Sequence, residues 1–142
     1  MTGKAALTTL EQDAMLAAAR AAMNKAYAPY SKSHVGAAVL DENGRIHAGC
    51  NVENAAYPQG VCAEAGALSA MVLAGGSRVR AVLVMGPGEA LVTPCGGCRQ
   101  KIREFAAPDA QVLIAGDAHI RASFTLEQLL PHSFGPEHLG KP

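Results

Sequence analysis

The 142-residue sequence has no tryptophan, and its only aromatic side chains besides histidine are three tyrosines and three phenylalanines. Proteins that bind single-stranded nucleic acid stack bases on aromatic side chains in a basic groove. Lysine plus arginine number 12 and aspartate plus glutamate also number 12, so the formal net charge is zero. The basic residues are scattered, whereas gripping a phosphate backbone needs a basic patch. A nucleic acid polymer is therefore not an expected partner.

Long apolar runs are also absent. No stretch approaches the roughly 18–20 apolar residues that span a bilayer, and the segment MTGKAALTTLEQ lacks an apolar run of the signal-peptide type. We therefore expect a cytoplasmic protein without a membrane partner. Hydrophobic residues make up 49% of the chain and charged residues 17%, as is typical of globular chains. The length fits a single domain over 1–142, with an extended tail over about 131–142.

The chain has four cysteines. In a cytoplasmic protein, cysteines indicate metal binding or catalysis before disulfides. The low aromatic content means that Ala, Val, Leu and Ile must form most of the core.

The pattern of apolar residues and turn residues predicts an alternation of helices and strands. Thr8 and Glu11 have capping-box spacing, so a helix is expected over about 10–25, with a buried stripe at Leu10, Ala14, Ala17, Ala18 and Ala21. Further helices are expected over 62–73 and 96–106. Strands are expected over 35–40, 45–50, 79–85 and 111–115, while 118–125 fits either a strand or a loop.

The first two strands flank Asp41-Glu42-Asn43-Gly44, which predicts a hairpin turn with Gly44 at positive φ. Gly75 and Gly76 close the second helix. The order of elements predicts an α/β fold, a mixed sheet with helices on both faces. The tail from 129 onward is expected to fold over the surface or onto a partner.

Two short segments carry the candidate chemistry: Val61-Cys62-Ala63-Glu64 and, 33 residues after Cys62, Thr93-Pro94-Cys95-Gly96-Gly97-Cys98. Three cysteine thiolates form a sensible ligand set for a catalytic zinc ion, which keeps a fourth position for water. Both segments open expected helices, and the partial positive charge of a helix N-terminus favours thiolate over thiol. We therefore predict one Zn²⁺ per chain, held by Cys62, Cys95 and Cys98.

Glu64 falls in the first turn of its expected helix, two residues after Cys62. From there its carboxylate can face a metal-activated water without being a ligand. It would take a proton from that water and return it to the substrate's ring nitrogen and then to the leaving amine. We therefore predict Glu64 as the catalytic residue.

Each of these residues also has a structural interpretation. A CxxC pair alone fits a redox site or half of a structural zinc site. A structural site would need a fourth ligand, and the remaining cysteine, Cys50, ends an apolar strand and is interpreted as a core residue. The histidines are scattered and are interpreted as surface or core residues; they are His34, His47, His119, His132 and His138.

Several further motifs accompany the two cysteine segments in order along the chain. They are Tyr27-Ala-Pro-Tyr-Ser31, Val35-Gly-Ala-Ala38, Asn51-Val-Glu-Asn-Ala55 with Tyr57, Pro94-Cys-Gly-Gly-Cys-Arg-Gln100 and Leu129-Leu-Pro-His-Ser-Phe-Gly135. With them, residues 10–138 resemble the small homotetrameric zinc-dependent cytidine deaminases of nucleoside salvage. The resemblance implies a three-layer α/β/α fold with a mixed five-stranded sheet. It also implies hydrolysis of cytidine and deoxycytidine to uridine and deoxyuridine, in a homotetramer that shares its sites between subunits.

The same resemblance implies roles for residues outside the metal site. Asn51 and Glu53 match the pair that hydrogen-bonds the ribose hydroxyls, and the backbone N–H of Ala63 matches the group that meets the carbonyl of the base. Tyr57 and Phe134 match positions that reach into the site of an adjacent subunit. For Phe134, packing of the tail is an equally good interpretation.

The sequence departs from the family pattern at two positions. Ser33 stands where the family usually has a phenylalanine that packs on the pyrimidine, and His34 is a candidate substitute. Ala65 stands where members with three cysteine ligands usually have an arginine, which offsets the excess negative charge of three thiolates on Zn²⁺. The two helix dipoles offset part of that charge, and Arg99 is a candidate for supplying more.

Alternative functions remain open at this point. The nearest is deamination of another small aminated nucleoside or of a blasticidin-type compound, although Asn51 and Glu53 favour a ribose. A polynucleotide-editing deaminase is disfavoured by the neutral charge and the few aromatic residues. The alternative without catalysis is a zinc-stabilised binding module.

Overall fold

The computed structural model of the chain describes residues 6–116 and 119–141. Its helices and strands, in chain order, are α1 (Thr9–Met23), β1 (Gly36–Asp41), β2 (Ile46–Cys50), the 3₁₀ helix η1 (Tyr57–Gln59), α2 (Ala63–Leu73), β3 (Val79–Gly86), α3 (Gly96–Phe105), β4 (Ala106–Gly116), β5 (His119–Thr125), α4 (Leu126–Leu129) and the 3₁₀ helix η2 (Pro136–Leu139). The predicted helices and strands occur in the predicted order, whereas η1, α4 and η2 were not predicted.

The strands form one mixed five-stranded sheet in the order β2-β1-β3-β4-β5. β3 and β4 run parallel, and the other neighbouring pairs are antiparallel. The β1–β2 connection is the predicted hairpin turn, with Gly44 at φ 80°. A parallel pair needs a crossover, and α3 lies within the connection from β3 to β4.

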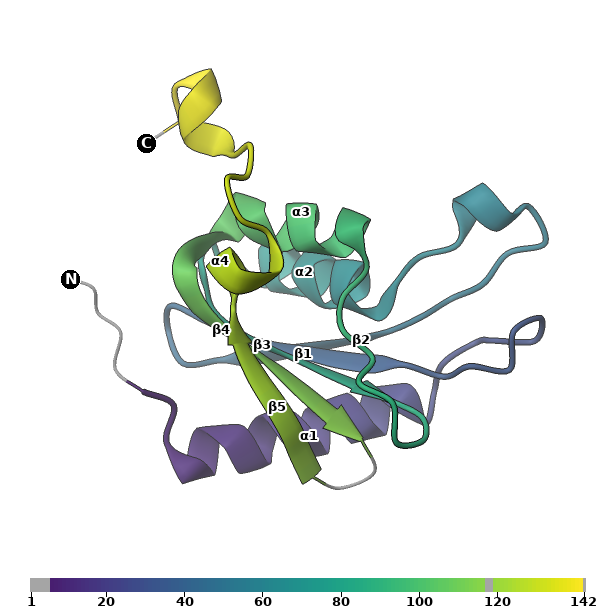
Figure 1. The fold of residues 1–142 in the computed structure, drawn as a ribbon. Helices are drawn as coiled ribbons and strands as arrows, with labels where there is room; N and C mark the ends of the chain where they lie inside the picture. The colour runs from purple at the N-terminus through teal and green to yellow at the C-terminus, as the bar shows by residue number, and fades with distance from the viewer. Residues whose placement is uncertain (1–5, 117–118, 142) are drawn as a thin grey trace.

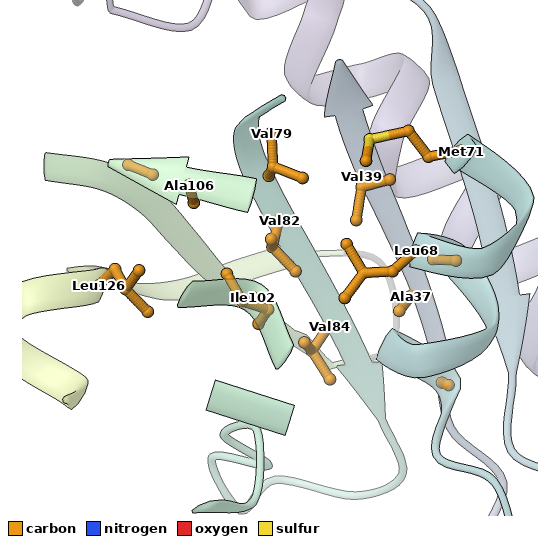
Figure 2. Close-up of a cluster of buried hydrophobic side chains, with 13 residues drawn as sticks. Ala37, Val39, Leu68, Met71, Val79, Val82, Val84, Ile102, Ala106 and Leu126 are labelled. Carbon is orange, nitrogen blue, oxygen red and sulfur yellow. The ribbon is translucent and has the colours of Figure 1, made fainter. Parts of the chain in front are cut away.

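Helices cover both faces of the sheet (Figure 1), as the sequence predicts. Side chains alternate along a strand, so each central strand contributes to two cores. On one face Val39, Val82 and Val84 pack with Leu68 of α2 and Ile102 of α3 (Figure 2). On the other face, two residues of α1 join strand residues in a second cluster: Met15 and Ala19 with Ala38, Leu40, Ala81, Leu83, Met85, Leu113 and Ala115. The three-layer arrangement therefore follows from strand alternation.

The start of α1 follows the prediction, but its buried stripe does not. Thr8 caps the helix: its Oγ1 accepts from the N–H of Glu11 at 3.0 Å, and the Glu11 carboxylate accepts from the N–H of Thr8 at 3.0 Å. The buried residues, however, are Met15 and Ala19, while the predicted Leu10 is 79% exposed. In a helix this rich in alanine, many positions are apolar, so the pattern did not fix which face turns inward.

β4 is longer than predicted. It begins at Ala106, directly after α3, whereas the sequence predicted a strand over 111–115. Its first residues pair irregularly: Val79 lies opposite Ala106, but Ala81 lies opposite Gln111. Pro108 lies in this irregular stretch, and proline lacks the N–H that a regular ladder needs. The segment predicted as strand or loop is strand β5, although residue 118 lies outside the described residues.

α2 packs very closely on β2 at Gly49. A Cβ added at Gly49 would lie 2.3 Å from the backbone N of Ala67 and 2.5 Å from the carbonyl O of Ala63. We expect Gly49→Ala to destabilise the protein by about 1–3 kcal/mol through overpacking, measured by urea unfolding. Gly66→Ala is the control, because its Cβ would meet only ordinary contacts, the nearest at 3.5 Å, and alanine favours the helix. Equal midpoints for the two variants would contradict this packing.

Asp41 is a fully buried carboxylate in the β1–β2 hairpin. Its oxygens lie 2.8 Å from the N–H of Asn43, 3.0 Å from the N–H of Arg45 and 2.7 Å from Nε2 of His47. Burial alone would raise the pKa of Asp41, but these hydrogen bonds, led by that of His47, outweigh it and hold the pKa below its usual range.

The lowered pKa of Asp41 predicts a loss of stability in acid. The contribution is complete above the unfolded-state pKa of about 3.9 and disappears as the pH falls through the lower folded-state value. Asp41→Asn should therefore unfold more easily at pH 7, by about 1–3 kcal/mol, and should lose less further stability below about pH 4 than the unchanged protein. Urea unfolding at a series of pH values tests this. Parallel pH profiles for the two proteins would refute it.

Candidate active site

Cys62 and Glu64 are placed by the start of α2. Cys62 is the N-cap residue, with extended backbone angles of φ −76° and ψ 157°, and its side chain makes no capping hydrogen bond. Ala63 and Glu64 follow in the first turn, and both are buried. The Cys62 thiol therefore stays available next to the unpaired N–H groups of a helix N-terminus.

Cys95 and Cys98 are placed by the start of α3 in the same way. Cys95 is the N-cap residue, again without a capping hydrogen bond from its side chain, and Cys98 lies buried in the first turn. Gly96 and Gly97 separate the two cysteines. Since α2 and α3 cover the same face of the sheet, the two helix starts bring all three cysteines together.

The sulfur atoms of Cys62, Cys95 and Cys98 lie within 4.8 Å of one another, and those of Cys62 and Cys95 are 4.0 Å apart. Tetrahedral ligands at the usual Zn–S length of about 2.3 Å would be about 3.8 Å apart, so the cluster fits one zinc ion after a small contraction. No other group of three histidine, cysteine or acidic side chains lies close enough in 6–116 and 119–141.

The three thiols differ in their electrostatic surroundings. Burial raises the pKa of Cys62 and strongly raises that of Cys98, and the nearby Glu64 carboxylate raises both further. The backbone N–H of Cys98, close to the Cys95 sulfur, outweighs some burial and holds the pKa of Cys95 below its usual value. A metal cation at the centre is what would favour three thiolates together.

Glu64 lies beside this cluster in a nearly dry position. Its side chain is 5% exposed, and burial raises its pKa, although its own backbone N–H and the Cys98 thiol oppose the shift. A carboxyl group with a raised pKa can both accept and release a proton near neutral pH. Among the buried residues of the described chain, Asp41 and Glu64 are the charged ones, and only Glu64 adjoins the sulfurs.

Comparisons with known proteins agree with this geometry. Residues 9–114 match the family model described as the cytidine and deoxycytidylate deaminase zinc-binding region. The chain belongs to this family. A cytidine deaminase from Sporosarcina psychrophila is 38% identical over 130 residues, covering 92% of this chain and 96% of the relative. One from Mycobacterium tuberculosis is 39% identical over 114 residues, covering 80% and 82%.

The fold is shared as well. The solved structure of a cytidine deaminase from Burkholderia pseudomallei has a TM-score of 0.81 at 38% identity, covering 90% of this chain and all of that one. The predicted family, the three-layer fold and the zinc cofactor are thus confirmed. The described helices include none that is both long and apolar enough to cross a membrane.

Asn51 and Glu53, the predicted ribose ligands, hold the 30–35 segment. Oδ1 of Asn51 accepts from the N–H of Val35 at 2.9 Å, and its Nδ2 donates to the Ser33 carbonyl at 2.8 Å. One carboxylate oxygen of Glu53 accepts from the N–H groups of Tyr30 and Ser31, at 2.9 and 3.1 Å. The sequence reasoning did not identify these contacts.

The Ser31 hydroxyl also donates to Glu53, to its second carboxylate oxygen. This hydroxyl contact leads the hydrogen bonds that hold the pKa of Glu53 below its usual value. The tyrosine- and serine-containing motif at 27–31 was the available sequence signal for this contact.

A cavity of about 430 Å³ lies beside this segment. Its lining residues are Tyr30, Ser31, Glu53, Asn54, Tyr57 and Gly60. Figure 1 shows the two arms that carry them, the segment before β1 and the segment with η1, projecting together beyond the sheet. Tyr57 is 78% exposed at the end of one arm, and its ring meets that of Tyr30 edge-on, with centroids 6.3 Å apart.

Phe134 lies in the tail, next to α3. It is 56% exposed, and its ring stacks on that of His138 with centroids 5.1 Å apart. Its carbonyl accepts from the Gln100 side chain at 3.0 Å. The tail rises past α3 and projects beyond it (Figure 1). The Phe134 ring therefore packs within its own tail and stays more than half exposed.

The two departures from the family pattern have structural counterparts. The N–H of Ser33 donates to the Ser31 hydroxyl at 3.0 Å. The backbone of Ser33 therefore helps to hold the segment before β1 in shape. Ala65 lies half-buried on α2. Arg99, the candidate for charge compensation, directs its guanidinium to oxygens of Thr93, Pro94 and Leu129. The Arg99 guanidinium therefore contacts the loop before Cys95, and these three hydrogen bonds go to oxygens and not to the cysteine sulfurs.

Proposed function

We propose that this protein hydrolyses the 4-amino group of free cytidine and deoxycytidine, giving uridine or deoxyuridine and ammonia. The observation that carries the proposal is the meeting of three cysteine sulfurs with one buried, charged side chain, Glu64, at the starts of α2 and α3. Family membership and curated relatives named cytidine deaminase support the substrate. We further propose that one catalytic domain acts in the cytoplasm, in pyrimidine salvage.

In this proposal Cys62, Cys95 and Cys98 hold the zinc ion. A zinc ion there supplies the Lewis acidity that makes a water molecule a nucleophile near neutral pH. The cluster with Zn²⁺ carries a net charge of −1, because three thiolates outweigh the ion by one unit. The N-termini of α2 and α3 offset part of this excess, since both present unpaired backbone N–H groups to the sulfurs.

Glu64 moves the protons. Its carboxylate accepts one proton from the attacking water and delivers it to the ring nitrogen N3; it then carries the second to the amine that leaves from C4. Water adds its oxygen to C4 and ammonia departs, so the reaction balances without a further reactant. The burial that raises the pKa of Glu64 suits this exchange.

Other groups in this proposal hold the substrate. The N–H of Ala63, at the start of α2, donates to the base carbonyl. Asn51 and Glu53 hydrogen-bond the ribose hydroxyls with the donor and acceptor capacity that their own contacts leave free. Glu53 is half-buried and lines the 430 Å³ cavity, which supports this role. Both side chains also hydrogen-bond the segment before β1. These contacts hold them in position before the substrate binds.

We also propose a homotetramer in which Tyr57 and Phe134 contribute to the sites of neighbouring subunits. Both aromatic rings are largely exposed, at 78% and 56%, and each projects from a segment beyond the sheet. Large exposed aromatic side chains are characteristic of protein interfaces. Light scattering would measure the assembly, and monomeric, fully active protein would rule out shared sites.

A second candidate is another small aminated nucleoside or a blasticidin-type compound, and Ser33 is the residue that favours it. To separate the two, purified protein is incubated with cytidine, deoxycytidine, cytosine and blasticidin S, and the products are followed by chromatography. The proposal expects conversion of the two nucleosides and little of the bare base, because Asn51 and Glu53 bind ribose. Conversion of blasticidin S alone would favour the second candidate.

A further inference from the structure

Arg99 is a half-buried residue of α3 whose guanidinium donates hydrogen bonds to three oxygens. Its Nε donates to the Pro94 carbonyl at 2.7 Å, and its Nη2 donates to Oγ1 of Thr93 at 3.1 Å. Its Nη1 donates to the carbonyl of Leu129, the last residue of α4, at 2.8 Å. One planar guanidinium thus joins the loop before α3, α3 itself and the end of α4.

The Pro94 carbonyl belongs to the peptide bond that leads into Cys95. The loop over 91–95 has no helix or strand to hold it. After Cys95 come Gly96, where an added Cβ would meet nothing within 4 Å, and Gly97, where it would meet only the end of the Lys101 side chain. Glycines in such open positions allow the backbone many conformations. The two glycines leave the chain after Cys95 free to move. Arg99 restrains the chain before Cys95 by its hydrogen bond to the Pro94 carbonyl.

The backbone of Arg99 adds to this restraint. Its N–H donates to the Cys95 carbonyl at 2.9 Å, so the same residue holds the carbonyls on both sides of Cys95. The contact with Leu129 uses a carbonyl at a helix end, which has no partner within the helix. Arg99 thus ties Cys95 to a second, separately packed element, because Leu126 of α4 is buried in the core shown in Figure 2.

We propose that Arg99 is a positioning residue of the metal centre: it fixes the Pro94–Cys95 peptide and thereby slows the loss of zinc from the three-cysteine cluster. This inference rests on the proposed zinc ligands, but not on the identity of the substrate. It assigns to Arg99 a geometric role instead of charge compensation. Groups that orient metal ligands commonly change metal affinity or activity by 10–100-fold when replaced.

Arg103 provides a matched control. It lies one helical turn further along α3, and its Nε donates to Ser133 at 2.8 Å while its Nη2 donates to Glu137. Like Arg99, it joins α3 to later parts of the chain, but within the described residues its side-chain hydrogen bonds go to the tail and not to the cysteine loop. Arg103→Gln therefore reports what loosening the tail does to the metal centre.

The experiment measures the rate at which zinc passes from the loaded protein to a chromogenic chelator, at a temperature where circular dichroism shows every variant folded. Arg99→Gln should release zinc about tenfold faster or more, and Arg103→Gln at nearly the original rate. Arg99→Lys should resemble Arg99→Gln, because one ammonium group cannot reach three oxygens in fixed directions. An unchanged rate in Arg99→Gln would overturn the proposal, as would equal acceleration in Arg103→Gln or full rescue by lysine.

Thr93→Val is the variant to measure if the Arg99 variants do not fold. It removes the acceptor of Nη2 and leaves the shape of the side chain nearly unchanged, so zinc release should rise by a smaller factor. Release at the original rate in a folded Thr93→Val protein would contradict the proposal. Because the assay needs no substrate, a protein that shows the Arg99 effect but leaves cytidine intact would refute only the proposed function.

Discussion

Glu64→Gln is expected to lower the rate of cytidine hydrolysis by about 10²–10⁴-fold, the range typical of a lost general acid–base group. Glutamine has nearly the same shape but cannot accept a proton from water. The substitution also removes a buried carboxylate whose charge raises the pKa values of Cys62 and Cys98. The variant should therefore fold and keep its zinc, so the loss appears in turnover and not in metal content.

Glu104→Gln is the control for that substitution. Glu104 lies exposed on α3, where its carboxylate is 3.5 Å from the Lys141 ammonium, and such surface pairs contribute little. Its turnover should match that of the unchanged protein. If Glu64→Gln retained substantial turnover, Glu64 would not be the proton carrier. If it lost zinc as well as turnover, Glu64 would be needed to hold the metal.

Cys98→Ala is expected to lose both zinc and turnover, because two remaining thiolates leave the ion without its third protein ligand. Cys98 is only 1% exposed, and alanine is small and apolar, so the fold should tolerate the change. Metal analysis of the dialysed protein should give far less than one zinc per chain, and cytidine conversion should fall to background.

Cys50→Ala separates this effect from the general loss of a cysteine. Cys50 ends β2 and is half-buried, outside the three-sulfur cluster. The variant should keep one zinc per chain and its full rate of cytidine hydrolysis. Zinc loss in Cys50→Ala equal to that in Cys98→Ala would make Cys50 a fourth ligand and would indicate a structural zinc site.

Local signals in the sequence predicted much of the fold and the metal cluster. The capping pattern at Thr8 and Glu11 and the turn at Gly44 depend on contacts within a few residues, so they can be recognised without a structure. The two cysteine segments open helices, and those helices pack on the same face of the sheet. Spacing and chemistry alone therefore identified the three cysteines that come together.

Features that depend on packing between distant segments could not be predicted in this way. The buried face of α1 is set partly by Gly36, where an added Cβ would lie 2.0 Å from the Ala19 carbonyl, and a chain rich in alanine gives no sign of that contact. The bonds of Arg99 to Leu129 and of Ser31 to Glu53 join residues 30 and 22 positions apart. Their partners become visible only once the chain is folded.

The most direct test of the account adds zinc stepwise to protein stripped of metal and follows the ultraviolet change as cytidine becomes uridine. The account predicts that the rate rises in proportion to added zinc and stops rising at about one zinc per chain, with Glu64→Gln binding the same amount but staying inactive. Conversion that is independent of zinc would contradict the account. So would a protein that binds one zinc per chain and leaves both cytidine and deoxycytidine unchanged.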